Sequence, residues 1–495
     1  MTTLRLFLLT LWLGLLSLPG LTVAAGDSMQ PDVRLLIDIS GSMKDSDPEN
    51  LRGPALELIV RMLPDGARAG VWLFAEEAEV LVEHRVVDEA WRKEALAAVA
   101  EIDNSGQLTN IPAAISAATY DLDRMNPGYR TSLVLLTDGK VDISESPMAN
   151  ATAARQLLGD LAPRLGETGI PVHTIALSEE ADWQFLESLA KTTGGISEEA
   201  ISPDELLRVY LRSLESAAPL ERVPVSKRSF LIDGSVQEFT ALAFHDGLDE
   251  KAFGLVGPAG AEYRPADEDP GTEWFVSGQF AMVTVASPAE GEWRLMAPQG
   301  ADLRVSVISD FTMDVDPPPS SLAAGKRAEI GLRLRDKGRV IDDPEVLALF
   351  ALALEIRSPS GKRRVINVSS RYPIPEDGEY RVTVPQMEEA GRYQLMLRVK
   401  SETLRRKLPL YIDVYAVGNA SGLTTRPVDY EENSLLLPAV TMGFILLLAI
   451  VIGLWIRRRR RKKRLALWEK RAASANDSGV FSGIQIDPDE RDGTA

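Results

Sequence analysis

Five side chains with oxygen donors occur in three separate stretches of this sequence. The stretch "LLIDISGSMKDSD" places Asp38, Ser40 and Ser42 around a glycine, directly after an apolar run. Thr109 lies in "GQLTNIPAAI", and Asp138 ends the apolar run of "LLTDGK". Carboxylate and hydroxyl oxygens are ligands of hard cations such as Mg²⁺, which requires an octahedral shell. Three oxygens from one loop cannot complete that shell, so we interpret all five residues as one metal site. Mg²⁺ is the expected ion, with Mn²⁺ or Ca²⁺ as alternatives.

A purely structural role is the alternative, because Asp and Ser are ordinary helix-capping residues. The surrounding pattern favours the metal site. From Val33 to about Ala218, short runs rich in Val, Leu and Ile alternate with stretches of helical periodicity, which predicts an open α/β sheet with mostly parallel strands. In such sheets, ligands bind beyond the carboxyl ends of the strands. The predicted strands are "VRLLID", "AGVWLFAE", "EVLVEHRV", "SLVLLTD" and "PVHTIALS", and the predicted helices are "PENLRGPALELIVRML", "IPAAISAATYDLDRM", "ARQLLGDLAPRL", "DWQFLESLAKTTGG" and "PDELLRVYLRSLESA".

The order Asp-x-Ser-x-Ser, then Thr, then Asp resembles the metal-ion-dependent adhesion site of the von Willebrand factor type A domain family. All five positions match in order, and the resemblance covers roughly residues 33–218. It implies a Rossmann-like fold and a divalent metal whose last coordination position is filled by an acidic side chain of a protein partner. It also implies that Ser40, Ser42 and Thr109 contact the metal, while the two aspartates hold it largely through water. One departure concerns residues 106–108, where Gly-Gln-Leu replaces the usual Gly-Gly before the threonine, so we expect this loop to differ.

After Pro219 the sequence changes to short strand patterns with turn signals and almost no helical periodicity. This pattern predicts two all-β sandwich (Ig-like) domains, separated by the Pro/Ser-rich stretch "DVDPPPSSLAAGK". The predicted organisation is a signal peptide at 1–25, the α/β domain at 31–218, β-sandwich domains at 223–313 and 322–416, a polar tether at 417–434, a transmembrane helix at 435–456 and a basic, then disordered, tail at 457–495.

Two apolar segments predict export and membrane anchoring. Residues 1–25 combine one charge, an apolar run and small residues before a cleavage point, as in a signal peptide. Residues 435–456 contain no charge and are long enough to span a bilayer. The basic run 457–464 follows at once and predicts a cytoplasmic C-terminus; nucleic-acid binding is the alternative for such a run. The chain is therefore expected in a cell inner membrane as a single-pass protein with a periplasmic N-terminal region.

The net charge of −18 disfavours binding to nucleic acid or anionic lipid and favours cationic partners or divalent ions; ordinary solubility is the other explanation. The sequence contains no cysteine, so an exported region of this size would lack disulfides, which favours a bacterial envelope protein.

The sequence offers little for catalysis. It has three histidines and no cysteine, which excludes thiol chemistry and disfavours a zinc cluster built from histidines. His-Glu-x-x-His, Gly-x-Gly-x-x-Gly and phosphate-loop motifs are absent. His173 lies in a strand pattern and is expected in the core. We therefore predict that the protein is not an enzyme.

The functional prediction is a receptor or scaffold of the bacterial envelope that binds a partner protein through the metal site. An envelope assembly or chaperone-like factor is the first alternative, and a hydrolase with an unrecognised site is the second. As a whole, the chain resembles uncharacterised proteobacterial single-pass membrane proteins that contain a type A domain.

Overall fold

The computed structural model describes residues 29–178, 181–200, 203–245, 250–267 and 269–416. The predicted signal peptide, polar tether, transmembrane helix and cytoplasmic tail lie outside these residues. Among the described residues, no helix combines the length and apolar character that crossing a membrane requires. All of them belong to one compact unit, Met1–Thr425.

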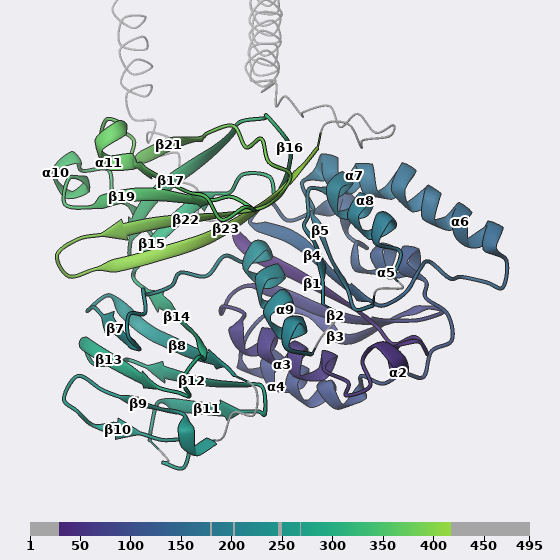
Figure 1. Cartoon of the computed structure of the whole chain (residues 1–495), viewed down its shortest axis with the longest axis horizontal. Helices are drawn as coiled ribbons and strands as arrows, with labels where there is room; N and C mark the ends of the chain where they lie inside the picture. The colour runs from purple at the N-terminus through teal and green to yellow at the C-terminus, as the bar shows by residue number, and fades with distance from the viewer. Residues whose placement is uncertain (1–28, 179–180, 201–202, 246–249, 268, 417–495) are drawn as a thin grey trace, which may run out of the picture. The chain divides into compact units, whose positions relative to one another are not determined.

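A six-stranded sheet forms the first part of the chain, with strand order β3-β2-β1-β4-β5-β6 (Figure 1). Neighbouring strands are parallel, except that β3 runs antiparallel to β2. This confirms the predicted mostly parallel sheet, in which all five predicted strands are present. The strands are β1 (Gln30–Asp38), β2 (Arg68–Phe74), β3 (Ala78–Val86), β4 (Tyr129–Thr137), β5 (Val172–Ala176) and β6 (Ser197–Glu199).

Helices cover both faces of this sheet. Successive side chains of a strand point to opposite faces, and β1 shows the consequence. Leu35 and Ile37 join a core with α3, α4 and α9, whereas Leu36 joins a core with α5, α7 and α8. The helices are α2 (Met43–Ser46), α3 (Arg52–Met62), α4 (Glu89–Ala98), α5 (Ile111–Ala118), α6 (Pro147–Gln156), α7 (Ala162–Thr168), α8 (Trp183–Thr193) and α9 (Pro203–Ala217), with a π-helical turn at Leu157–Leu161 and 3-10 turns at Val99–Glu101 and Leu122–Arg124.

Two pairs of sheets follow, each pair around its own core, and their strands pair antiparallel except that β16 runs parallel to β23. In the first β module, sheets β10-β9-β13-β7 and β11-β12-β8-β14 enclose Phe230, Phe239 and Trp293. Its elements are β7 (Ser229–Ile232), β8 (Val236–Phe244), β9 (Gly254–Val256), β10 (Glu262–Tyr263), β11 (Thr272–Val276), β12 (Phe280–Ala286), β13 (Gly291–Met296) and β14 (Asp302–Ser309), with a 3-10 turn at Glu250–Ala252.

The second β module pairs β15-β17-β18, extended by β21, with β16-β23-β22-β19-β20. Its elements are β15 (Phe311–Asp316), β16 (Ser321–Ala323), β17 (Ala328–Asp336), β18 (Arg339–Val340), β19 (Ala351–Arg357), β20 (Arg363–Asn367), β21 (Glu379–Val384), β22 (Gly391–Lys400), β23 (Arg405–Tyr415), α10 (Pro344–Leu347) and α11 (Val368–Arg371). The predicted range 223–313 ends inside β15. Because β15 pairs with β17, the change of module falls between β14 and β15 instead.

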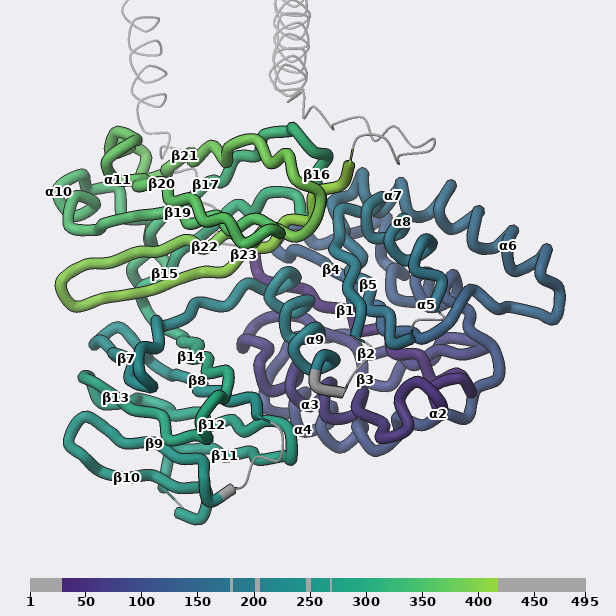
Figure 2. The backbone as a smooth tube through the Cα atoms, in the orientation of Figure 1, coloured from purple at the N-terminus to yellow at the C-terminus, as the bar shows by residue number. Residues whose placement is uncertain are grey.

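The first β module also packs against the α/β domain. Phe244 of β8 and Phe280 of β12 belong to the same apolar cluster as α3 and α9. Figure 2 follows the chain from α9 into β7 and the two modules. The α/β domain and the first module therefore share buried surface as well as a connecting segment.

Candidate metal centre

The five predicted ligands lie at the carboxyl edge of the first sheet. Asp38 is the last residue of β1, and Asp138 directly follows β4, the parallel neighbour of β1. Ser40 and Ser42 lie between β1 and α2, and Thr109 precedes α5. Because adjacent parallel strands end at the same edge, side chains 100 positions apart in the sequence come together here.

Hydrogen bonds link the serines to the second aspartate. The Ser42 hydroxyl donates to Asp138 Oδ1 over 2.9 Å, and the Ser40 and Ser42 hydroxyl oxygens are 3.2 Å apart. Thr109 Oγ1 lies 3.4 Å from the point where a β-carbon on Gly139 would stand, so this hydroxyl faces the backbone next to Asp138. Asp38, Ser40, Thr109 and Asp138 are buried, whereas Ser42 is exposed. The cluster therefore has one side open to solvent.

Asp38 is fully buried and held on both carboxylate oxygens. Oδ1 accepts the backbone N–H of Ser40 at 2.8 Å, and Oδ2 accepts the hydroxyl of Thr137 at 2.5 Å. Burial raises the pKa of Asp38 to about 6; hydrogen bonds from Thr137 and Ser40 oppose this rise, and the charge of Asp138 adds to it. Two carboxylates at one buried edge create a negative electrostatic potential, and a nearby cation would stabilise their charged forms.

The loop that departs from the expected family pattern is fitted closely to this edge. Gly106 forms a parallel bridge with Ser40, and its N–H donates to the carbonyl of Ile39 at 3.1 Å. A β-carbon at position 106 would stand 2.3 Å from that of Ala75, so only glycine fits. Thr109 is fixed through its backbone, which exchanges two hydrogen bonds with Asp142.

Two residues of this region were not indicated by the sequence. The Ser46 hydroxyl donates to Asp138 Oδ2 at 2.6 Å, so Ser42 and Ser46 occupy both oxygens of that carboxylate. The two serines are four residues apart, which is about one helical turn, and this spacing could have identified Ser46 from the sequence.

Among the described residues, no cluster of three or more His, Cys, Asp or Glu side chains has metal-binding geometry. The candidate centre instead combines two carboxylates with hydroxyls.

Arg52 is the second such residue, and it supports the end of β1 from behind. Its buried guanidinium donates to the carbonyl of Asp38 at 2.5 Å and to Asp47 at 2.8 Å, and it also contacts Asn104. It therefore connects the first loop to the segment that leads to Gly106. Arg52 touches none of the five candidate ligand side chains and acts by positioning their loops.

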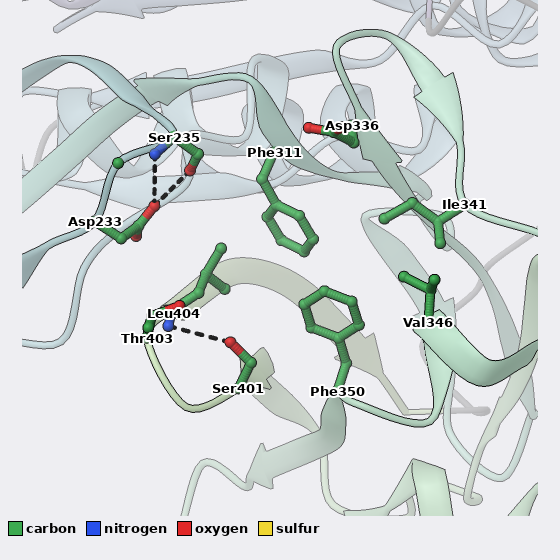
Figure 3. Close-up of a pocket in the computed structure, with 11 residues that line it drawn as sticks. Asp233, Ser235, Phe311, Asp336, Ile341, Val346, Phe350, Ser401, Thr403 and Leu404 are labelled. Atoms are coloured by element: carbon green, nitrogen blue, oxygen red, sulfur yellow. Dashed lines mark hydrogen bonds between the residues drawn. The ribbon is translucent and has the colours of Figure 1, made fainter. Parts of the chain in front are cut away.

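A separate cavity of about 390 Å³ lies in the β modules, and none of the five candidate ligands lines it. Figure 3 shows Phe311 and Phe350 at its centre, with ring centroids 5.2 Å apart, and Asp233 accepting hydrogen bonds from Ser235. Apolar side chains make up much of its lining, including Phe311, Phe350 and Leu404, so it does not resemble the cluster of oxygen donors at the metal centre.

A comparison with solved structures finds matches of low sequence identity. The von Willebrand factor type A protein from Catenulispora acidiphila is 19% identical, covers 63% of this chain and 64% of its own, and has a TM-score of 0.33. Proximal thread matrix protein 1 from the mussel byssus, with a zinc-occupied MIDAS motif, is 17% identical over 40% of this chain and 50% of its own, with a TM-score of 0.30. BatB from Bacteroides thetaiotaomicron is 19% identical over 38% of this chain and 100% of its own, with a TM-score of 0.29. This chain thus spans less than two thirds of the length of the first two of these proteins.

No curated protein matches the sequence significantly. Residues 32–205 match the family described as "von Willebrand factor type A domain". The matched range begins in β1 and ends in α9, so it includes the whole six-stranded sheet. Residues 32–205 of this chain are therefore a von Willebrand factor type A domain.

Proposed function

We propose that the protein binds a partner protein through a divalent cation held by Asp38, Ser40, Ser42, Thr109 and Asp138. The observation that carries this proposal is the Ser42 to Asp138 hydrogen bond, which joins the first loop to the end of β4 at the edge where Thr109 also lies. A type A domain is in general an interaction module, which agrees with the absence of catalytic motifs in the sequence.

The side chains present fit a hard divalent cation. All five donors are oxygens, and two are carboxylates, one of them fully buried. Mg²⁺ prefers such donors, and Mn²⁺ and Ca²⁺ accept them. When bound, the cation would offer an electrophilic position to an acidic side chain of the partner. Ser42, which is exposed, lies on the side from which that side chain would approach.

We further propose that the type A domain binds its partner outside the cytoplasm. This step rests on the sequence of the two terminal apolar segments, which predict export and a single membrane span. The two β modules would then serve as a stalk or as an additional docking surface between the membrane and the type A domain, in a receptor or scaffold of the bacterial envelope.

Metal binding can be tested before the partner is known. Purified full-length protein is titrated calorimetrically with Mg²⁺ and with Mn²⁺. Wild type should bind one ion, and Asp138→Ala should bind none while keeping its circular dichroism spectrum. Asp45→Ala is the matched control, because Asp45 is an exposed carboxylate on α2 outside the site. Equal affinity in wild type and Asp138→Ala would refute the site.

Partner binding needs a second experiment. Crosslinking in intact cells followed by purification should recover the same partner with Mg²⁺ but not with a chelator, and not with Asp138→Ala. A partner recovered equally under all these conditions would show that recognition occurs elsewhere on the chain, even if the metal binds.

A further inference from the structure

A second cavity, a polar cleft of about 520 Å³, lies between β14 and the outer face of the sheet formed by β19, β22 and β23. None of the five candidate metal ligands lines it. Its acidic lining residues are Asp302 and Glu355. We call it the basic cleft, after its five cationic lining residues, Arg222, Arg304, Arg357, Arg398 and Lys407.

The carboxylates in and behind the basic cleft are too few for its cations. Glu355 is shared by three guanidiniums, with Arg398 at 2.5 Å, Arg363 at 2.8 Å and Arg357 at 3.8 Å. Glu215 of α9, behind the cleft, pairs with Arg222 and lies 3.7 Å from Arg304. Asp302 pairs with Arg304 at 3.1 Å, so three carboxylates serve five guanidiniums.

Lys407 is the one cation of the cleft lining that no carboxylate pairs with among the described residues. Among the described residues its ammonium group forms no ion pair, although it is partly buried. Burial lowers the pKa of Lys407, the charges of Arg222 and Arg398 lower it further, and the charge of Glu355 opposes this only in part. The neighbourhood of this side chain is thus electropositive in a protein whose total charge is −18.

The strand register places like charges directly opposite one another. Arg398 of β22 is the cross-strand partner of Lys407 in β23, and Arg357 of β19 is that of Arg363 in β20. Such pairs destabilise a sheet unless an anion lies between them. Glu355 meets this need for Arg357 and Arg363 and also contacts Arg398, but it forms no ion pair with Lys407.

The backbone holds these groups in place. Arg222 and Lys407 exchange two main-chain hydrogen bonds, of 2.8 and 2.9 Å, which fix the segment after α9 against β23. Within the part of the chain that the structure describes, Arg222 Nε and Arg304 Nη1 have no hydrogen-bond partner. The cleft is therefore a preformed cluster of cations with unused donor capacity.

We propose that the basic cleft binds a soluble anion of the phosphate class that carries two or more negative charges. Guanidinium groups bind phosphate oxygens in a bidentate manner, and several cations around one cavity favour a multivalent anion. The volume is in the range of small-molecule sites, roughly 300–1,000 Å³. Most of the lining is charged, with Leu303 and Met396 as its aliphatic members, so it offers little surface for a lipid chain.

The test uses pyrophosphate with purified full-length protein, in a chelator and at low salt, so that the metal centre plays no part. Calorimetry should show binding to wild type and to Asp138→Ala. The double variant Arg398→Gln/Lys407→Gln should bind at least about tenfold more weakly, because two charge-assisted contacts are lost. Lys400→Gln/Arg405→Gln is the matched control. It removes the next like-charge pair on the same two strands, which is exposed and does not line the cleft, and it should bind as wild type does.

The single variant Lys407→Gln keeps the test decisive if the double variant folds poorly. Removing an unpaired cation should leave the melting temperature unchanged or raise it, while the increase in melting temperature caused by pyrophosphate should shrink. No binding to wild type, or equal losses in the cleft and control variants, would overturn the proposal. Binding only to vesicles of phosphatidic acid in phosphatidylcholine would show that the anion is a lipid headgroup and would refute the proposal of a soluble anion.

Discussion

Ser46 donates a hydrogen bond of 2.6 Å to Asp138, a residue 92 positions away in the sequence. Ser42 donates to the other oxygen of the same carboxylate. The single turn of α2 thus fixes the orientation of Asp138, and Asp138 in turn holds α2 against the end of β4. The candidate metal centre is organised by this contact as well as by its five candidate ligands.

Replacing Ser46 with alanine should weaken metal binding without abolishing it. The Asp138 carboxylate would lose the donor that holds Oδ2, and loss of such a supporting hydrogen bond typically reduces metal affinity by about 10- to 100-fold. Calorimetric titration of full-length Ser46→Ala with Mn²⁺ measures this loss. Ser105→Ala is the control, because its exposed hydroxyl donates to Asp103 away from the site. Wild-type affinity in Ser46→Ala would show that Ser42 alone orients Asp138.

Replacing Arg52 with methionine should destabilise the fold. The Arg52 and Asp47 side chains are buried, so the substitution leaves a buried carboxylate without its cation and frees the carbonyl of Asp38. Breaking a buried pair in this way costs about 3–5 kcal/mol. Denaturant unfolding gives the difference from wild type.

Arg164→Met is the comparison for this measurement, because the Arg164 to Asp123 pair is exposed and should contribute less than about 1 kcal/mol. Similar losses for the two variants would mean that Arg52 contributes no more than a surface charge does.

The type A domain could be predicted from sequence because its signals are local. Asp38 and Asp138 each end an apolar run, and parallel strands bring such ends to one edge. His173 was also expected in the core, and its side chain is fully buried. Ser46 and Arg52 were not found, because their roles depend on partners that only the folded chain brings near.

Other features of the fold could not be predicted from the sequence and became apparent only in the structure. The three residues of β6 carry no apolar run, so no strand was expected there. The helix predicted over "ARQLLGDLAPRL" is interrupted by a π-helical turn, and Pro163, which has no N–H to donate, lies just after it. The basic cleft arises from strands of two modules, and no sequence pattern indicates which of their arginines meet.

Asp32 should make the protein sensitive to acid. Burial alone would raise the pKa of Asp32, but hydrogen bonds from His84 and Arg34, together with their charges, lower it from 3.8 to about 2. The unfolded chain therefore binds this proton at a higher pH than the folded chain does. The resulting stabilisation is present above pH 4 and is lost as the pH falls towards 2; it amounts to about 2 kcal/mol.

Unfolding free energies of wild type and Asp32→Asn between pH 6 and pH 2 test this expectation. The variant is less stable throughout, because Arg34 loses one of its two carboxylate partners. The change in stability with pH should be smaller in the variant by about 2 kcal/mol. Parallel curves for the two proteins would exclude Asp32 as a source of acid sensitivity.

Glu198 should hold the second β module to the type A domain. Its buried carboxylate lies between Arg212 of α9, at 2.6 Å, and Arg392 of β22, at 2.5 Å. The Glu198→Gln substitution removes the charge that both guanidiniums share and leaves Arg392 paired with Asp413 of its own sheet. We expect a loss of about 3 kcal/mol in unfolding free energy and faster amide hydrogen exchange in β6 and the adjoining end of β22. Glu94→Gln, which changes an exposed pair with Arg85, should alter neither measurement appreciably. Unchanged exchange in β6 and β22 of Glu198→Gln would show that other contacts hold the second module in place.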